Sequence, residues 1–274
     1  MNSLLLDTRE AVVTITLNRP DQGNAIDMDL ASQLRDVARE VALDEQVRCV
    51  VLTGQGKMFC AGGDIHAFAA ATDRRTFLSE LARTLHEAVT SFAMMEKPLV
   101  VLVNGPAAGA GLSLTAIGDV VLAADVAHFT AAYTRIGLTP DGGLTWLLPK
   151  LIGVRRAQEM IIGNRRLSAD EAVAFGLVTR TVPHADLAAQ GAAAADDLAE
   201  ASTMAIGASR ALLLRGAAVG FTDHLDAEAA MIGESAARAD GREGVAAFLE
   251  CRPPSFGSPD RPVSAMPSRT ATRK

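Results

Sequence analysis

The sequence has few aromatic residues and few cysteines. Aromatic residues make up 4% of the 274 residues, and tyrosine and tryptophan occur once each. The three cysteines, Cys49, Cys60 and Cys251, are odd in number and far apart, without the spacing of a metal site. This pattern excludes a small disulfide-stapled domain, and the expected compartment is the reducing cytoplasm.

A basic excess and a membrane-length apolar run are also missing. Lys and Arg number 26 against 32 Asp and Glu, so the formal net charge is -6. Nucleic-acid binders usually carry a basic excess or stripe, so we expect no nucleic-acid partner. No apolar run reaches the roughly 18 residues of a membrane span, so we expect no membrane either. A chain of this length can bury a large core without metal or disulfide staples.

Apolar spacing predicts alternating strands and helices in the first half of the chain. Residues 13–17 alternate between apolar and polar side chains, as in a half-buried strand. Apolar residues between 26 and 41 recur at spacings of 4, 4, 3 and 4, which marks one face of a helix. Other strands are expected at 4–6, 49–53, 99–103 and 120–124, a polar turn at 7–10, and a second helix at 77–95. The order predicts a βαβ architecture.

The second half is rich in alanine and predicted to be helical. It opens with Ser168 and Glu171, which match a capping box, and helical patterns continue to about Leu249. A short strand-like break falls at 178–182. We therefore expect a core with the functional site at 1–195, a C-terminal helical region at 196–256 and a disordered tail at 257–274.

Two glycine-rich turns each connect a buried strand to a helix. They are Phe59–Ile65 and Asn104–Gly111. Small residues let a ligand approach the backbone, and a helix N-terminus presents free N–H groups. Two such turns side by side could hold an anionic oxygen between two amides. The alternative for either turn alone is tight strand-to-helix packing. Neither turn has the GxGxxG or GxxxxGK[ST] spacing of a nucleotide site.

The order and spacing of these motifs resemble the crotonase (enoyl-CoA hydratase/isomerase) superfamily, over about residues 3–256. The motifs are Phe59–Ile65, Asn104-Gly105 with Gly109–Gly111, Pro140–Gly143, Leu17–Pro20 with Asn24-Ala25, and Arg242–Leu249. The resemblance implies an α/β fold with a spiral ββα core and a helical C-terminal region for trimer assembly. It also implies a homotrimer or a dimer of trimers that takes an acyl-CoA thioester. Coenzyme A would then be part of the substrate, and no separate cofactor or metal is expected.

The resemblance also assigns site residues. The backbone N–H groups of Gly63 and Ala110 would form an oxyanion hole for the thioester oxygen; the family usually has Gly where Ala110 stands, and Ala keeps the amide. The expected coenzyme A contacts are Asn24, Ala25, Ala61, Asp64 and Ile65, and the expected acyl-pocket residues are Tyr133, Ser113, His66 and Trp146. Tyr133 has a structural hydrogen bond as its alternative role. For His66 we favour an exposed loop position, and for His86 a structural role.

The two catalytic glutamates of the family's hydratases are missing. Counted from the second glycine turn and from Phe129, their positions hold Ser113 and Tyr133. Hydration requires a base for water and a proton donor for C2 of the substrate. The loss of both carboxylates therefore argues against a hydratase.

One acid, Asp141, remains in a suitable place. The stretch Gly137–Pro149 resembles the phenylacetate-pathway isomerases that act on ring-1,2-epoxyphenylacetyl-CoA and also shift enoyl-CoA double bonds; their catalytic aspartate matches Asp141. One carboxylate suffices for this chemistry, because it can remove the C2 proton of a 3-enoyl thioester and return it at C4. We therefore favour an isomerase with Asp141 as the proton shuttle.

Four other interpretations remain at this stage. Asp141 could be a helix N-cap residue without a catalytic role. The chain could be a hydratase, or a scaffold that binds acyl-CoA without catalysis. A dehalogenase branch of the family uses an aspartate at this position as a nucleophile, with an aromatic residue where Tyr133 stands. That branch also uses a histidine where this chain has Thr90, which weakens the fourth interpretation.

Overall fold

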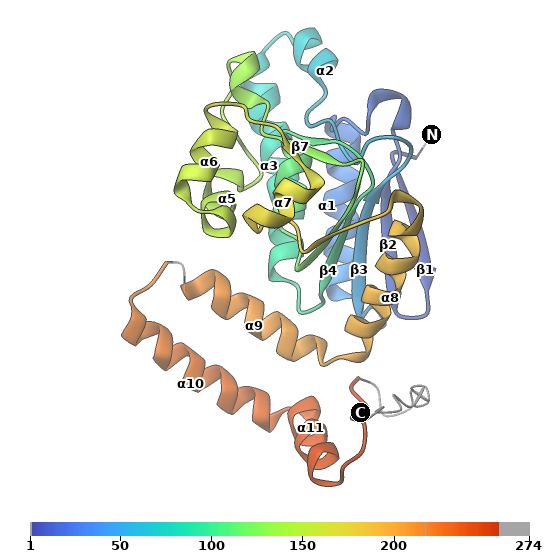
Figure 1. Cartoon of the computed structure of the whole chain (residues 1–274), viewed down its shortest axis with the longest axis vertical. Coiled ribbons are helices and arrows are strands. Elements are labelled where there is room, and N and C mark those ends of the chain that lie inside the picture. The colour runs from blue at the N-terminus through green and yellow to red at the C-terminus, as the bar shows by residue number, and fades with distance from the viewer. Residues whose placement is uncertain (1, 217, 258–274) are drawn as a thin grey trace, which may run out of the picture.

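Strands of the core form a six-stranded sheet with a smaller sheet beside it (Figure 1). The structure, a computed structural model, describes residues 2–216 and 218–257. The order in the large sheet is β1 (Leu4–Arg9), β2 (Val12–Leu17), β3 (Cys49–Gly54), β4 (Leu99–Val103), β6 (Val120–Ala124) and β9 (Arg180–Val182). The small sheet contains β5 (Ala107–Ala108), β7 (His128–Thr130) and β8 (Leu167–Ser168). In the large sheet β1 pairs antiparallel with β2, and all other neighbours are parallel.

Helices cover both faces of the large sheet. On one face α1 (Met28–Leu43) packs against α3 (Arg74–Met94), and on the other lies α8 (Leu187–Glu200). Within β3, Val50 and Leu52 belong to the core shared with α1 and α3, whereas Val51 belongs to the core under α8. Because both faces are buried, these strands are continuous apolar runs and do not alternate with polar residues. The strands expected at 99–103 and 120–124 are confirmed.

The first strand is longer than expected. The sequence predicted a polar turn at 7–10, but β1 continues to Arg9 and the turn is confined to residues 10–11. Five of the six residues of β1 are exposed. Because β1 is an edge strand with only β2 as its neighbour, polar side chains can face water while the backbone stays paired.

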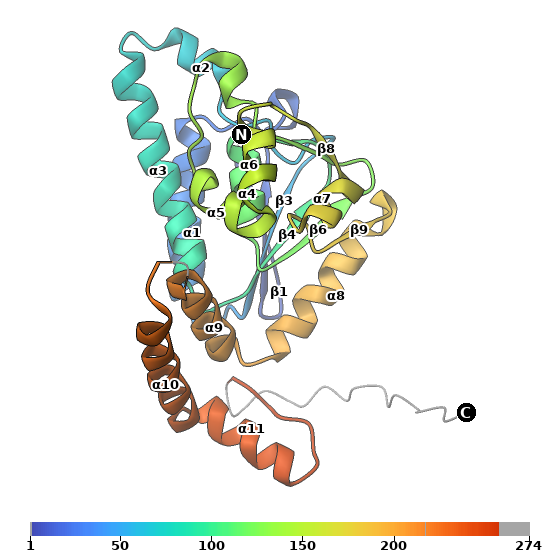
Figure 2. The same ribbon diagram turned by 60° about the vertical axis from the view of Figure 1, so that its left-hand side comes forward.

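The C-terminal region begins later than the expected boundary at 195/196. Helix α8 runs through that boundary, and its Ala195 and Ala199 belong to the core under the sheet. The next helices are α9 (Thr203–Gly216), α10 (Phe221–Ala237) and α11 (Ala239–Leu249), and Figure 2 shows α10 and α11 projecting away from the core. Of the tail expected at 257–274, only Gly257 lies within the described residues. No helix in the described part is long and apolar enough to cross a membrane.

Arg210 ties α9 to the sheet. Its guanidinium donates to Asp119 Oδ2 at 2.8 Å, to the carbonyl of Lys97 at 3.0 Å and to the carbonyl of Met95. Burial lowers the pKa of Arg210 and raises the pKa of Asp119. Asp119 Oδ2 also accepts from the N–H of Leu99 at 2.7 Å, at the start of β4. The C-terminal helices are thus anchored through one ion pair, in which the arginine side chain is 9% exposed and the aspartate side chain 21% exposed.

This anchor predicts a large difference between two arginine substitutions. Arg210→Met leaves the Asp119 carboxylate without its cation and should lower the free energy of unfolding by about 3 kcal/mol. The matched control is Arg238→Met, because Arg238 forms an exposed ion pair with Glu96 and such pairs contribute less than about 1 kcal/mol. Urea denaturation at one fixed protein concentration measures both. Equal losses in the two variants would show that Arg210 is not the anchor.

Candidate active site

The two glycine-rich turns lie directly against each other. The N–H of Ala108 donates to the carbonyl of Cys60 at 2.9 Å. A Cβ atom on Gly62 would lie 3.0 Å from the carbonyl oxygen of Ala108, and one on Gly109 would lie 3.4 Å from Gly62 Cα. Both glycines also have positive φ angles, 100° and 54°. Glycine is therefore required at both positions, for conformation and for close approach.

Each turn ends in an N–H group that no acceptor satisfies. These groups belong to Gly63 and to Ala110, which is the first residue of α4 (Ala110–Ala116). Within residues 2–216 and 218–257, neither N–H donates a hydrogen bond. The first N–H groups of a helix have no intrahelical partner. Both residues line one cavity, so the two free donors serve the same space.

That cavity has a volume of about 410 Å³ and mainly apolar walls. The apolar lining comprises Ile65 and Phe68 of α2 (Ile65–Ala70), Leu78, Leu81 and Leu85 of α3, and Ile136 and Leu138 after β7. Among all the residues that line it, Asp141 is the one carboxylate. An apolar pocket with a few converging polar groups is the usual form of a small-molecule site.

The Asp141 carboxylate is held by a tyrosine hydroxyl. The Oη of Tyr133, in the short helix η2 (Tyr133–Ile136), donates to Asp141 Oδ1 at 2.6 Å. Burial, the charge of Asp141 and this hydrogen bond together raise the pKa of Tyr133 far above its ordinary value. The hydroxyl therefore stays protonated and remains a donor. Tyr133 itself lines the cavity beside Asp141.

The main chain around Asp141 is held from two other helices. Ser113 Oγ, from α4, donates to the carbonyl of Asp141 at 2.9 Å. The N–H of Gly142 donates to His86 Nε2, from α3, at 3.0 Å. The following helix, α5 (Leu144–Ile152), has Gly143 as its N-cap residue, without a side-chain cap. The N-cap interpretation of Asp141 is therefore wrong, and its side chain is available to the cavity.

Comparison with known proteins identifies the family. The family described as enoyl-CoA hydratase/isomerase matches residues 7–259. The chain belongs to this family. The expected family and its α/β crotonase fold are thereby confirmed.

Relatives within the enoyl-CoA hydratase/isomerase family carry different names. A protein of Rhodobacter capsulatus named "Probable enoyl-CoA hydratase" is 37% identical over 256 residues, which are 93% of this chain and 98% of that protein. The "1,2-epoxyphenylacetyl-CoA isomerase" of Escherichia coli is 35% identical over 264 residues, with the same two shares. The crystal structure of an enoyl-CoA hydratase from Bacillus anthracis matches with a TM-score of 0.87 and 30% identity, covering 93% of this chain and 99% of that one.

The residues that the family resemblance assigns to coenzyme A occupy different environments. Ala61 and Ile65 line the cavity, and Ala25 is buried beside the first turn. Asp64 caps α2 by accepting from the N–H groups of His66 and Ala67, and it forms a 3.0 Å ion pair with Arg19. The structure thus gives Asp64 a structural task at the start of α2.

Asn24 supports the first glycine turn from within. It is fully buried, and its amide nitrogen donates to the carbonyls of Gln55, Met58 and Phe59 at 3.0, 2.8 and 3.1 Å. Its Oδ1 accepts from the N–H of Arg19 at 2.9 Å. Asn24 therefore has no surface exposed to a ligand, and its assignment as a coenzyme A contact is wrong.

Of the four expected acyl-pocket residues, only Tyr133 lines the cavity. Ser113 lies behind it, fully buried, with its hydroxyl 3.4 Å from Tyr133 Oη. His66 is exposed on α2, as the loop alternative suggested. Trp146 lies on the outer side of α5, 43% exposed, with Lys150 Nζ 3.4 Å from its ring centroid. The pocket assignments of Ser113, His66 and Trp146 are therefore wrong.

Sequence reasoning missed two features of the site. Leu81 and Leu85 lie on the helix expected at 77–95, and besides packing in the core they form a wall of the cavity. The hydrogen bond of His86 to the loop after Asp141 had no signal in the sequence, because it depends on how α3 and that loop pack together.

Cys60 is a packing residue. It is fully buried, and its Sγ lies 3.2 Å from the carbonyl oxygen of Asn24. Burial raises the pKa of its thiol to about 12. The thiol therefore stays protonated near neutral pH and is no nucleophile.

Within the described residues, no group of three His, Cys, Asp or Glu side chains could hold a metal ion.

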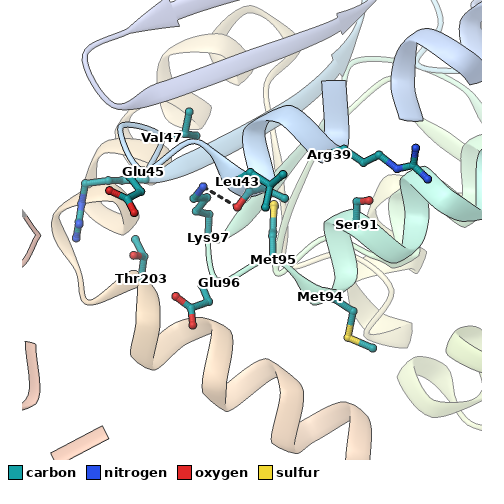
Figure 3. Close-up of a pocket in the computed structure, with 12 residues that line it drawn as sticks. Arg39, Leu43, Glu45, Val47, Ser91, Met94, Met95, Glu96, Lys97 and Thr203 are labelled. Atoms are coloured by element: carbon teal, nitrogen blue, oxygen red, sulfur yellow. Dashed lines mark hydrogen bonds between the residues drawn. The ribbon is translucent and has the colours of Figure 1, made fainter. Parts of the chain in front are cut away.

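A second hollow, of about 610 Å³, lies between the C-terminal ends of α1 and α3 and the start of α9 (Figure 3). Lys97 is buried there, and its Nζ donates to the carbonyls of Val41, Ala42 and Asp44 at 2.7, 2.9 and 2.6 Å. The ammonium group of Lys97 thus caps the C-terminal end of α1. Leu43 and Met94, which also line the hollow, are 82% and 68% exposed.

Proposed function

We propose that this chain is an acyl-CoA isomerase that shifts a double bond in an enoyl-CoA thioester, with Asp141 as the proton shuttle. The observation that carries the proposal is the lining of the 410 Å³ cavity, where Asp141 is the one carboxylate beside two free N–H donors. The name of the Escherichia coli relative, an isomerase of an acyl-CoA, supports it. The hydratase positions hold only hydroxyl groups, those of Ser113 and Tyr133.

The reaction uses the two N–H donors and the Asp141 carboxylate together. The N–H groups of Gly63 and Ala110 bind the thioester oxygen, and Asp141 removes a proton from C2 of a 3-enoyl thioester. The C2–H bond electrons enter the conjugated system, so the dienolate charge resides mainly on the oxygen between the two donors. The protonated Asp141 then delivers the proton to C4, which gives the 2-enoyl thioester and restores the carboxylate. The proton balance closes without a cofactor.

Coenzyme A would enter past the first glycine turn. Ala61 and Ile65 line the cavity on that side, and Ile65 is 49% exposed. The coenzyme A contacts proposed here are therefore Ala61 and Ile65, with Ala25 and Asp64 beneath them. The acyl group then lies between α2 and α3, against the apolar wall formed by Phe68, Leu81 and Leu85.

The first test replaces the proposed shuttle. Asp141→Asn keeps size and polarity but cannot accept the C2 proton, so isomerisation should fall by at least about 10³-fold. Acyl-CoA affinity should change by no more than a few fold. The assay follows the conjugated thioester absorbance with 3-enoyl-CoA, and binding is measured with saturated acyl-CoA. Full activity in Asp141→Asn would overturn the proposal.

Parallel substrates separate the remaining alternatives. Wild type with 2-enoyl-CoA reports hydration, and an aroyl-CoA with a halogen on its ring reports nucleophilic use of Asp141. Faster hydration than isomerisation would favour the hydratase, the name of the Rhodobacter capsulatus relative. Halide release would favour the dehalogenase, and binding without any turnover would favour the scaffold.

The second test removes one proposed oxyanion donor. Ala110 is the first residue of α4, where proline is tolerated because that N–H has no helical partner. Ala110→Pro should therefore fold, and it should lose about 10²-fold in turnover because the amide donor is gone. Ala110→Gly, which keeps the N–H, is the matched control. Circular dichroism checks the fold, and unchanged turnover in a folded Ala110→Pro protein would refute the oxyanion hole.

The C-terminal helices support a homotrimer or a dimer of trimers. No residue of α10 is buried in the single chain. Large apolar side chains that are more than 60% exposed there and on α11 are Phe221, Ile232, Val245, Phe248 and Leu249. An exposed apolar surface of this kind marks an interface. Because the family resemblance implies a trimer, we propose that the partners at this interface are further copies of the same chain.

Sedimentation tests the assembly. The 28.6 kDa chain should sediment at three or six times its monomer mass at micromolar concentration. Phe248→Asp introduces a charge on α11 and should shift the population toward monomer, whereas Leu5→Asp, on the exposed edge strand, should not. A wild-type protein that sediments only as a monomer would contradict the proposal.

A further inference from the structure

The Tyr133 hydroxyl and the Asp141 carboxylate form a fixed pair at the edge of the cavity. Tyr133 Oη donates to Oδ1 at 2.6 Å, and Ser113 Oγ lies 3.4 Å behind that hydroxyl. Ser113 also holds the main-chain carbonyl of Asp141 at 2.9 Å. Two atoms of Asp141, one in the side chain and one in the main chain, are thus bound by neighbouring hydroxyl groups. The carboxylate is thereby restrained in both position and rotation.

This restraint distinguishes the two carboxylate oxygens. Oδ1 already accepts a short hydrogen bond, and the structure gives Oδ2 no partner within the described residues. We infer that Tyr133 is a positioning residue that fixes Oδ1 and leaves Oδ2 as the oxygen that exchanges a proton with the substrate. The inference rests on the proposed isomerase function, and it assigns one oxygen atom to both proton transfers.

A single oxygen matters because the proton must travel from C2 to C4. A carboxyl group that can rotate exposes both oxygens and exchanges its proton with water more readily. A carboxyl group locked by Tyr133 keeps the proton facing the dienolate until it reaches C4. Tyr133 remains a donor throughout, because burial and the nearby charge keep its pKa high.

One other titratable group contacts this loop. His86 Nε2 accepts from the N–H of Gly142 at 3.0 Å, so the bond requires a neutral ring at that nitrogen. Protonation of His86 would remove this acceptor and disturb the loop at low pH. Gln at position 86 keeps an acceptor and does not titrate, so His86→Gln is the background in which pH profiles are compared.

The first experiment measures Tyr133→Phe in wild type and in the His86→Gln background. We expect kcat to fall about tenfold, which corresponds to the loss of one hydrogen bond to a charged group, with KM within about twofold. The acid limb of the kcat/KM profile should move to higher pH, because a carboxylate that loses a donor binds a proton more readily. Deuterium transfer from C2 to C4 should also fall, because the freed carboxyl group exchanges with water. Unchanged profile and label transfer in a folded variant would overturn the inference and leave Tyr133 a structural residue.

The second experiment needs no turnover. Tyr133 is the only tyrosine of the chain, so tyrosinate absorbance reports this residue alone. In Asp141→Asn the carboxylate charge is removed, so the pKa of Tyr133 should fall below that of wild type, although burial still holds it up. No difference between the two titrations would overturn the pairing.

The two experiments distinguish two kinds of failure. In one outcome the tyrosine pKa differs between wild type and Asp141→Asn, but wild type does not isomerise 3-enoyl-CoA. That outcome refutes the proposed function and leaves the pairing of Tyr133 with Asp141 in place. Isomerisation that is lost in Asp141→Asn but keeps its label transfer in Tyr133→Phe refutes the positioning role alone.

Discussion

The close approach of two main-chain turns is the constraint on which the site depends. Gly62 and Gly109 meet without side chains, and a Cβ atom on Gly111 would lie 2.4 Å from the carbonyl oxygen of Cys60. Any larger residue at these positions would separate the turns. The separation would move the N–H groups of Gly63 and Ala110 apart, which would weaken the proposed oxyanion hole. The parallel strands β3 and β4 bring the turns together, because the second turn begins directly after β4 and the first turn follows β3 after residues 55–58.

The contact between the two turns also sets the direction of α4, and α4 in turn contacts the loop that carries Asp141. Ser113, one turn into α4, donates to the carbonyl of Asp141. The loop comes so near that a Cβ atom on Gly142 would lie 2.7 Å from Ser113 Cβ. Gly142 and Gly143 both have positive φ angles, so the chain can pass α4 and still begin α5. Helix α4 therefore connects the proposed oxyanion hole at its first residue, Ala110, to the loop of the proposed base through Ser113.

The sequence predicted the strands, turns and helix cap that local residue patterns encode. It missed the side-chain orientations and long-range hydrogen bonds that depend on tertiary packing. Continuous apolar runs located the buried strands, the glycine spacing located both turns, and Ser168 caps α7 (Ala169–Phe175) in a capping box as expected. Trp146 and His66 are near Asp141 and Gly63 in sequence, yet helix geometry turns both side chains away from the cavity. Asn24 carries a polar side chain like that of a ligand contact, and only the fold shows that it donates to three main-chain carbonyls. The bond between His86 and Gly142 joins residues 56 positions apart, beyond any local pattern.

The absence of carboxylates at the two positions where the family resemblance places the hydratase glutamates is physically linked to the presence of Asp141. By that resemblance Tyr133 stands at one of these positions, and its hydroxyl lies 2.6 Å from Asp141 Oδ1. A carboxylate brought equally close would repel Asp141, and two carboxylates at that separation cannot both stay ionised. A hydroxyl in the same place donates a hydrogen bond to Asp141 instead. At the other position Ser113 is fully buried, where a glutamate would lose its hydration without a cation in contact. A single carboxylate at Asp141 is therefore compatible with neutral side chains at both of these positions, and this chain has a hydroxyl group at each.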